Sequence, residues 1–134
     1  MVARLRRGEH GFTLIELMVV MAIIVILASI GVASYTNSIT RSKEAVLKED
    51  LFRMRDAIDQ YFADKGKYPS ALDELVQEKY LRAMPVDPFT QSADSWQTEM
   101  SEPDPSNPSD STGIVNVKSG AEGTSLDGSK YSEW

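Results

Sequence analysis

Cysteine is absent from the 134 residues, and the only histidine is His10. A chain without cysteine cannot form a disulfide and has no thiol nucleophile. Histidine is the most common general acid or base in enzymes, so its near absence removes that route as well. Catalysis would have to rest on carboxylates, serines or a metal, and the acidic residues are scattered along the polar stretches. We therefore expect no enzyme, and an anchored enzyme or binding module is a distant alternative.

Clusters of basic residues are also lacking beyond the N-terminal tip. The chain has 14 Lys and Arg against 20 Asp and Glu, which gives a formal charge of −6. Such a chain is repelled by phosphate groups, so we expect no nucleic-acid partner. Its length allows one small domain and one extended element. Because no disulfide can stabilise that domain, a metal ion or an assembly is the remaining means of support.

A long apolar run lies close to the N-terminus. Residues 17–40 contain no Lys, Arg, Asp or Glu. At about 1.5 Å per residue, a helix of this length crosses a hydrocarbon layer of roughly 30 Å, so we expect a membrane segment. A secretory signal peptide is the alternative, but such peptides are cut after the apolar stretch. Here the small residue, Gly11, precedes the stretch, and a cut after it removes only residues 1–11 as a leader.

One carboxylate interrupts the beginning of this run. Glu16 stands about one turn inside it, where an ionised side chain costs about 3 kcal/mol on insertion scales. Near the end of a helix, the carboxylate could reach out to the lipid headgroups. Alternatively, it pairs with a positive charge from another chain, and a cut after Gly11 would create such a charge on the α-amino group of Phe12. The residues alone leave both interpretations open.

The apolar run continues into an amphipathic helix. Apolar side chains recur there at steps of three and four, and Gly66 with Pro69 ends the pattern. We expect one helix over about residues 12–65. Its apolar part covers residues 12–40. Its amphipathic part and a globular head together make up residues 41–134. Aromatic residues along the helix raise the alternative of electron conduction, but aromatics at helical spacing usually serve packing. The residues of the amphipathic stripe are Leu47, Leu51, Met54, Ile58 and Tyr61.

The remaining sequence predicts a short second helix followed by two strands. Ser70 is the expected N-cap of the helix, because acidic residues follow it. The strands are expected at 96–100 and 114–119, separated by a polar loop rich in proline. We expect Trp134 to pack onto the sheet. The fold class is α+β, a long N-terminal helix on a small antiparallel sheet. The expected buried side of the second helix is Leu72, Leu75, Val76, Tyr80 and Leu81.

The segment GFTLIELMVVMAIIVILASI, which begins at Gly11, resembles the signal of type IV pilins and type II secretion pseudopilins. These proteins have a glycine before the cut, an N-methylated phenylalanine after it and a glutamate at the fifth mature position. The resemblance implies that the prepilin peptidase cuts after Gly11, that Phe12 becomes methylated, and that Glu16 pairs with the Phe12 amine of a neighbouring subunit. Many members have a proline where this chain has Ala33, and Gly31 is the expected weak point in its place.

Two further stretches are similar to the major pseudopilin of type II secretion systems. Residues 47–90 share its K-G-x-Y-P turn and P-x-D-P segment, and the ending at 119–134 resembles its C-terminal loop. The resemblance implies a type IV pilin-like fold and a structural subunit that polymerises into a pseudopilus, which drives protein export across the outer membrane. The alternative is the major pilin of a type IV pilus, serving adhesion or motility. Many such pilins carry a C-terminal disulfide, which this chain cannot form.

The same resemblance implies partners and a location. The partners are other copies of the chain, minor pseudopilins, the prepilin peptidase, an inner-membrane assembly platform and, before assembly, membrane lipid. The chain would cross the bacterial inner membrane once, with its N-terminus in the cytoplasm and its head in the periplasm. After assembly it would belong to a periplasmic filament.

The resemblance also implies a structural calcium ion, because the C-terminal loop of that branch binds Ca²⁺. Hard oxygen ligands suit this ion, and the loop offers them at four positions. The alternative is a metal-free turn at Asp127-Gly128, held by hydrogen bonds. The candidate ligands are Glu122, Asp127, Ser119 and Ser125.

Overall fold

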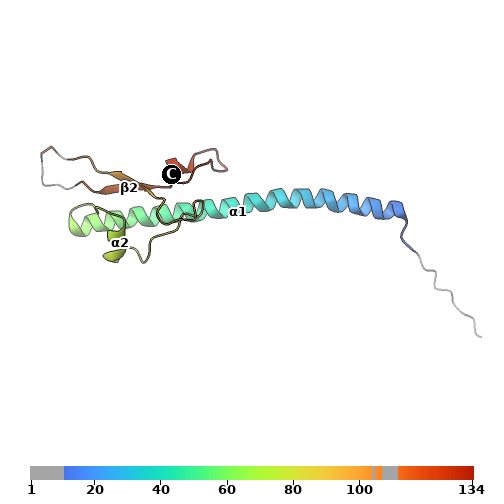
Figure 1. Cartoon of the computed structure of the whole chain (residues 1–134), viewed down its shortest axis with the longest axis horizontal. Coiled ribbons are helices and arrows are strands. Elements are labelled where there is room, and N and C mark those ends of the chain that lie inside the picture. The colour runs from blue at the N-terminus through green and yellow to red at the C-terminus, as the bar shows by residue number, and fades with distance from the viewer. Residues whose placement is uncertain (1–10, 104, 107–111) are drawn as a thin grey trace, which may run out of the picture. The chain divides into compact units, whose positions relative to one another are not determined.

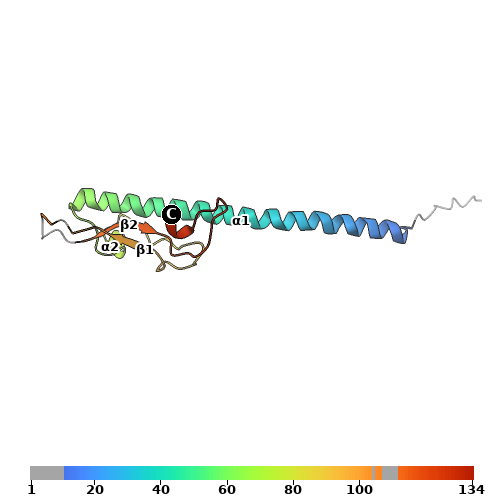
Figure 2. The same ribbon diagram turned by 90° about the horizontal axis from the view of Figure 1, so that it is seen from above.

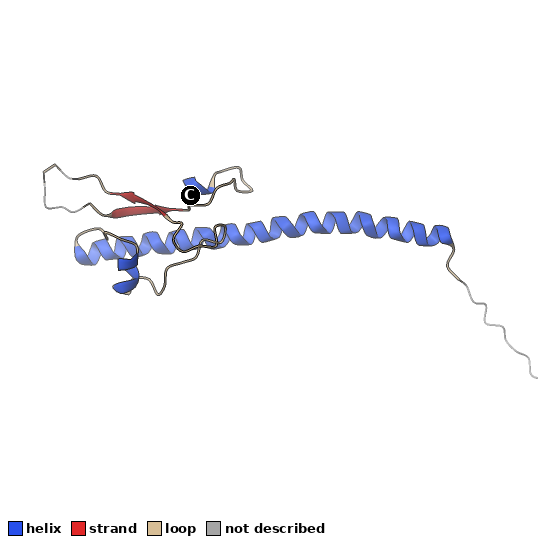
Figure 3. Cartoon of the chain, viewed as in Figure 1, coloured by secondary structure: helices blue, strands red, loops and turns tan. Residues whose placement is uncertain are grey.

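The computed structural model describes residues 11–103, 105–106 and 112–134 (Figure 1). The predicted leader, apart from Gly11, lies outside these residues. The chain divides into two compact units, Met1–Asn37 and Ser38–Trp134, which are described separately. The elements are helices α1 (Leu14–Lys65) and α2 (Asp73–Gln77), strands β1 (Gln97–Met100) and β2 (Ile114–Lys118), and the 3-10 helix η1 (Tyr131–Glu133), coloured by type in Figure 3. The predicted α+β class is confirmed.

Helix α1 runs without a break for 52 residues. It ends as predicted, because Gly66 takes a left-handed conformation (φ 69°) and its amide bonds the Phe62 carbonyl at 2.8 Å. The helix continues through the expected weak point at Gly31. Hydroxyl groups on either side of that glycine bond back to the preceding turn, with Ser29 donating to the Val25 carbonyl at 2.5 Å.

The core of the Ser38–Trp134 unit lies between α1 and the head segments that follow it. The predicted stripe of α1 is buried throughout, and Figure 2 shows both strands and α2 beside this half of the helix. Each fully buried aliphatic side chain contributes about 1.5–3 kcal/mol, so the helix is an integral part of the head. The residues that complete the core cluster are Ala57, Leu75, Trp96, Ile114, Val117, Ala121 and Tyr131.

The second helix begins later than predicted. Helix α2 starts at Asp73, Leu72 occupies the N-cap position, and no side chain caps the helix. Ser70 instead donates its hydroxyl to the Glu74 carboxylate. The predicted N-cap was wrong because this nearby carboxylate competes with the backbone amides for the serine. Of the side chains expected to be buried, only Leu75 is fully so.

Strands β1 and β2 form an antiparallel pair in which Gln97 lies opposite Lys118. Both strands were predicted to within one residue. A two-stranded sheet is marginal alone, but β2 is fastened to α1 because Arg55 donates to the Val117 carbonyl through Nε at 3.2 Å and Nη2 at 2.8 Å. Trp96, just before β1, is buried and donates to the Pro85 carbonyl at 2.9 Å.

Candidate functional site

The first predicted site lies at the start of α1. Phe12 precedes the helix and is 84% exposed, and Glu16 lies in the first turn. The Glu16 amide donates to Thr13 Oγ1 at 3.2 Å, so Thr13 caps this end of the helix. Among the described residues, none offers the Glu16 carboxylate a hydrogen bond or an ion pair.

The N-terminal part of α1 presents apolar side chains on every side. No residue from Gly11 to Ile39 is buried within the chain. Among the described residues, α1 is the one helix that is long and apolar enough to cross a membrane. Its position near the N-terminus fits a single membrane anchor. An apolar surface of this extent requires a cover of lipid or of other protein chains.

The second predicted site is the C-terminal loop, where Asp127 is surrounded by serines. Its Oδ1 accepts hydrogen bonds from the Ser125 hydroxyl and from Ser129, whose amide lies at 2.9 Å and hydroxyl at 2.6 Å. These hydrogen bonds, that of Ser125 first, hold the pKa of Asp127 well below its ordinary value. Gly128 (φ 93°) makes the tight bend predicted here.

Of the four predicted calcium ligands, Ser125 and Asp127 are joined by a hydrogen bond. Ser125 and Asp127 are adjacent, but the Ser119 hydroxyl is buried and donates to Asp87 Oδ2 at 2.5 Å. Glu122 is exposed, and within the described residues no three acidic or histidine side chains gather as a metal site. The hydrogen bonds that Asp127 accepts end on Oδ1. Its other oxygen, Oδ2, the serine hydroxyls and the loop carbonyls are oxygen ligands of the kind that Ca²⁺ takes. Asp127 and Ser125 offer oxygens that suit such an ion, whereas the Ser119 hydroxyl is already bonded to Asp87.

Asp87 is a buried carboxylate that sequence reasoning missed. Besides the Ser119 hydroxyl, it accepts the amides of Phe89 at 2.8 Å and Thr90 at 3.3 Å. It thereby joins the segment after α2 to the start of the C-terminal loop. Its local turn is typical of aspartate, which bonds to backbone two residues on, but nothing local in the sequence points to Ser119.

The other end of the C-terminal loop is attached to α1 by Glu44. One oxygen of its carboxylate, Oε1, accepts the Leu126 amide and the Tyr131 hydroxyl, both at 2.9 Å. Burial, together with this hydrogen bond, raises the pKa of Tyr131 to about 12. The contacts span 82 and 87 residues of sequence, so no short motif could have revealed them.

An aromatic cluster surrounds this attachment. Tyr131 stacks on Phe89 with ring centroids 4.2 Å apart and meets Trp134 edge-on at 5.2 Å. The Lys48 ammonium lies 4.4 Å from the centre of the Trp134 ring, a cation–π contact. Trp134, which was predicted to pack onto the sheet, is half-buried against the core cluster, which includes Ile114 and Val117 of β2.

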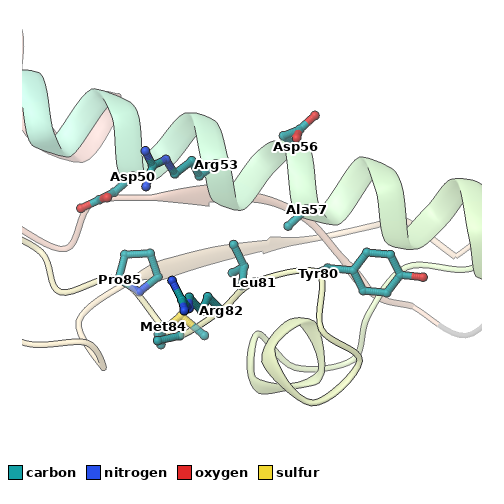
Figure 4. Close-up of a pocket in the computed structure, with 10 residues that line it drawn as sticks. Asp50, Arg53, Asp56, Ala57, Tyr80, Leu81, Arg82, Met84 and Pro85 are labelled. Atoms are coloured by element: carbon teal, nitrogen blue, oxygen red, sulfur yellow. The ribbon is translucent and has the colours of Figure 1, made fainter.

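An open groove of about 450 Å³ lies between α1 and residues 80–85 (Figure 4). Asp50, Arg53 and Asp56 line it from α1, and Arg53 is paired with Glu49 at 2.8 Å. Burial, as the largest cause, raises the pKa of Asp50 above its ordinary value. Tyr80 lines the groove and donates its hydroxyl to Asp64 at 2.7 Å, and the described residues that line the groove include no serine, cysteine, lysine or histidine.

Comparison with known proteins shows which families the chain resembles. The prokaryotic N-terminal methylation motif matches residues 6–32. Type II secretion system core protein G of Pseudomonas aeruginosa is 36% identical over 100 residues, covering 63% of this chain and 70% of that protein. The core protein G of Klebsiella michiganensis is 30% identical over 100 residues with the same coverage. No solved structure matches.

A fimbrial relative is covered over a smaller part of its length. Fimbrial protein EcpC of Eikenella corrodens is 34% identical over 87 residues, covering 61% of this chain and 57% of that protein. The chain thus spans just over half of EcpC, against 70% of the two secretion proteins. The similarity to the secretion proteins is therefore the more complete of the two.

Proposed function

Because this chain belongs to the family of the type II secretion system core protein G, we propose that it is a structural subunit of a secretion filament. It polymerises into a pseudopilus that drives protein export across the outer membrane. The observation that carries this proposal is the N-terminal part of α1, in which no side chain is buried within the chain. Lipid covers this surface before assembly, and neighbouring copies cover it afterwards.

The register between neighbouring copies is set by Glu16. The prepilin peptidase cuts after Gly11, Phe12 becomes the methylated N-terminus, and its amino group on one subunit pairs with Glu16 of the next. In a medium of low dielectric constant an unpaired carboxylate is costly and a paired one is tolerated. The charge pair therefore selects one stagger between helices whose apolar surfaces could otherwise slide.

Topology follows from this processing. The leader remains in the cytoplasm, the N-terminal part of α1 crosses the inner membrane once, and the Ser38–Trp134 unit lies in the periplasm. Minor pseudopilins and an inner-membrane assembly platform are the remaining partners. The charge of the chain, 14 Lys and Arg against 20 Asp and Glu, supports a role without nucleic acid.

Substitution of Glu16 tests the filament. We expect Glu16→Gln to insert and to be cut after Gly11 but to give few or deranged filaments, because only the pairing between subunits is removed. Mass spectrometry of the membrane-extracted chain checks cleavage and methylation, and electron microscopy of sheared filaments checks assembly. The matched control is Glu49→Gln, an exposed carboxylate further along α1, which should assemble normally. Normal filaments from Glu16→Gln, or a retained leader in the unaltered chain, would count against the proposal.

Calcium is a separate proposal for the C-terminal loop. Asp127 and Ser125, with Glu122 and loop carbonyls, hold one Ca²⁺, whose positive charge offsets the carboxylates and cross-links the loop. We expect the chelator EGTA to lower the melting temperature of the chain, because a ligand that binds only the folded state stabilises it. Asp127→Asn should abolish that difference. Equal melting curves with EGTA and with Ca²⁺ would leave the loop as a metal-free turn.

A surface pilus is the second candidate, favoured by the similarity to fimbrial protein EcpC. A bacterial strain in which the gene for this chain is deleted distinguishes the two functions. Loss of exported proteins with normal surface pili supports the secretion filament. Loss of surface pili with normal export would replace it with the pilus.

A further inference from the structure

We propose that Glu44 positions the C-terminal loop on α1 and keeps it docked whether or not a cation is bound. The proposal goes beyond the filament function and does not rest on it. It concerns how the C-terminal loop stays attached to the head when no disulfide holds it. Three features of the structure carry it.

The first feature is the convergence of two donors on one oxygen. Leu126 lies inside the turn that contains Asp127, and Tyr131 begins η1 after it; the Leu126 amide and the Tyr131 hydroxyl both donate to Glu44 Oε1 at 2.9 Å. A single carboxylate on α1 thus holds both the turn and the start of η1. Hydrogen bonds to an ionised acceptor are shorter and stronger than those between neutral groups.

The second feature is the setting of the phenol. The Tyr131 ring is buried, stacked on Phe89 and edge-on to Trp134. A hydroxyl held at the edge of such a cluster needs an acceptor, and Glu44 supplies it. Desolvation and this hydrogen bond raise the pKa of Tyr131 to about 12.

The third feature is that a second contact with the C-terminal segment comes from the same face of α1. Lys48 follows Glu44 by one turn and lies over Trp134, with Nζ 4.4 Å from the ring centre. Asp127, by contrast, has its hydrogen bonds from Ser125 and Ser129, within the loop itself. The candidate cation donors therefore shape the turn, whereas Glu44 and Lys48 attach it to the helix.

Hydrogen exchange at the Leu126 amide tests this proposal on the full chain in detergent micelles. In the unaltered chain we expect this amide to stay protected after EGTA treatment. In Glu44→Ala its exchange should accelerate about tenfold or more, as expected for the loss of about 1.4 kcal/mol of local stability. Glu49→Ala, on the same helix and exposed, should exchange like the unaltered chain.

Tyr131→Phe provides a milder variant in case Glu44→Ala does not fold. It keeps the ring in the cluster and removes one of the two donors to Glu44, so Leu126 exchange should rise several-fold while the Val117 amide in β2 stays protected. Two results would overturn the proposal: EGTA alone exposing Leu126 as fully as Glu44→Ala, or both variants exchanging like the unaltered chain. Neither readout depends on filaments, so failure here leaves the secretion function untouched.

Discussion

Asp87 is a fully buried carboxylate, and the donors that reach it are two amides and one hydroxyl. Asp87→Ala would leave the Ser119 hydroxyl and the amides of Phe89 and Thr90 without their acceptor. Since an unsatisfied buried group costs about 1–3 kcal/mol, we expect a loss of about 3 kcal/mol in the free energy of unfolding. Urea unfolding followed by tryptophan fluorescence measures it. Exposed Asp94 is the control, and Asp94→Ala should change stability by less than about 0.5 kcal/mol.

The raised pKa values of two tyrosines predict how the stability of the chain changes at high pH. The pKa is raised to about 12 for Tyr131, chiefly by burial, and for Tyr80, chiefly by a hydrogen bond to Asp64. The folded chain keeps these protons while the unfolded chain loses them near pH 10. Their contribution is therefore complete below pH 10 and is lost as the pH rises from about 10 to 12.

Urea midpoints measured at pH 9 and pH 11 check this prediction. The midpoint of the unaltered chain should fall between the two values, and the double variant Tyr80→Phe/Tyr131→Phe should fall less. Tyr35, an exposed tyrosine in the apolar part of α1, gives the control, Tyr35→Phe. An equal fall in the double variant would show that other groups cause the alkaline loss.

The residues assigned to the N-terminal site are predictions from sequence alone, which was possible because their pattern is local. Thr13 could have been found in the same way, since a threonine three residues before a glutamate is the mark of a capped helix start. Glu44 and Asp87 could not. Each acts through partners more than 30 residues away, and which carboxylate meets which loop depends on tertiary packing.

At the scale of elements, α1 was predictable and α2 was not. Helix α1 has 52 residues, and its apolar pattern is long and ends at a glycine. A single side-chain hydrogen bond therefore cannot change the predicted helix much. Helix α2 has only five residues, so one hydroxyl bonding to a carboxylate instead of the backbone moves its start from Ser70 to Asp73. The strands were found because β-branched residues favour extended structure and a proline-rich loop separates the two segments.

The turn between β2 and the C-terminal loop makes a close backbone approach. A Cβ added to Gly120 would stand 1.9 Å from the Ser95 carbonyl oxygen, which is backbone and cannot rotate away. We expect Gly120→Ala to destabilise the chain by more than about 2 kcal/mol, as overpacking does, and calorimetry should show the lower melting temperature. Gly66→Ala is the contrast, because its added Cβ meets no atom within 4 Å and only its left-handed φ costs about 1 kcal/mol. Equal losses in both variants would show that the Ser95 contact relaxes.

At the scale of the whole chain, the part that assembles and the part that folds are separate in sequence. Every residue of the core cluster lies between Leu47 and Tyr131, and residues 11–37 bury no side chain within the chain. A fragment that begins at Ser38 therefore keeps all the described packing of the head and loses only the surface assigned to lipid and neighbouring copies. We expect it to be a soluble monomer that melts within about 5 °C of the full chain, since about 1 kcal/mol shifts the melting temperature by about 4–8 °C in a domain of this size.

Sedimentation and calorimetry of this fragment measure the two properties independently. The fragment should add to no filament, because both Phe12 and Glu16 are gone and the apolar surface with them. If it unfolded, the N-terminal half of α1 would be needed for the fold itself. If it polymerised, contacts between heads would be sufficient for assembly, and the register assigned to Glu16 would lose its role. A folded monomer that leaves filaments of the full chain unchanged when mixed with them would place the whole of the assembly energy in the N-terminal helix.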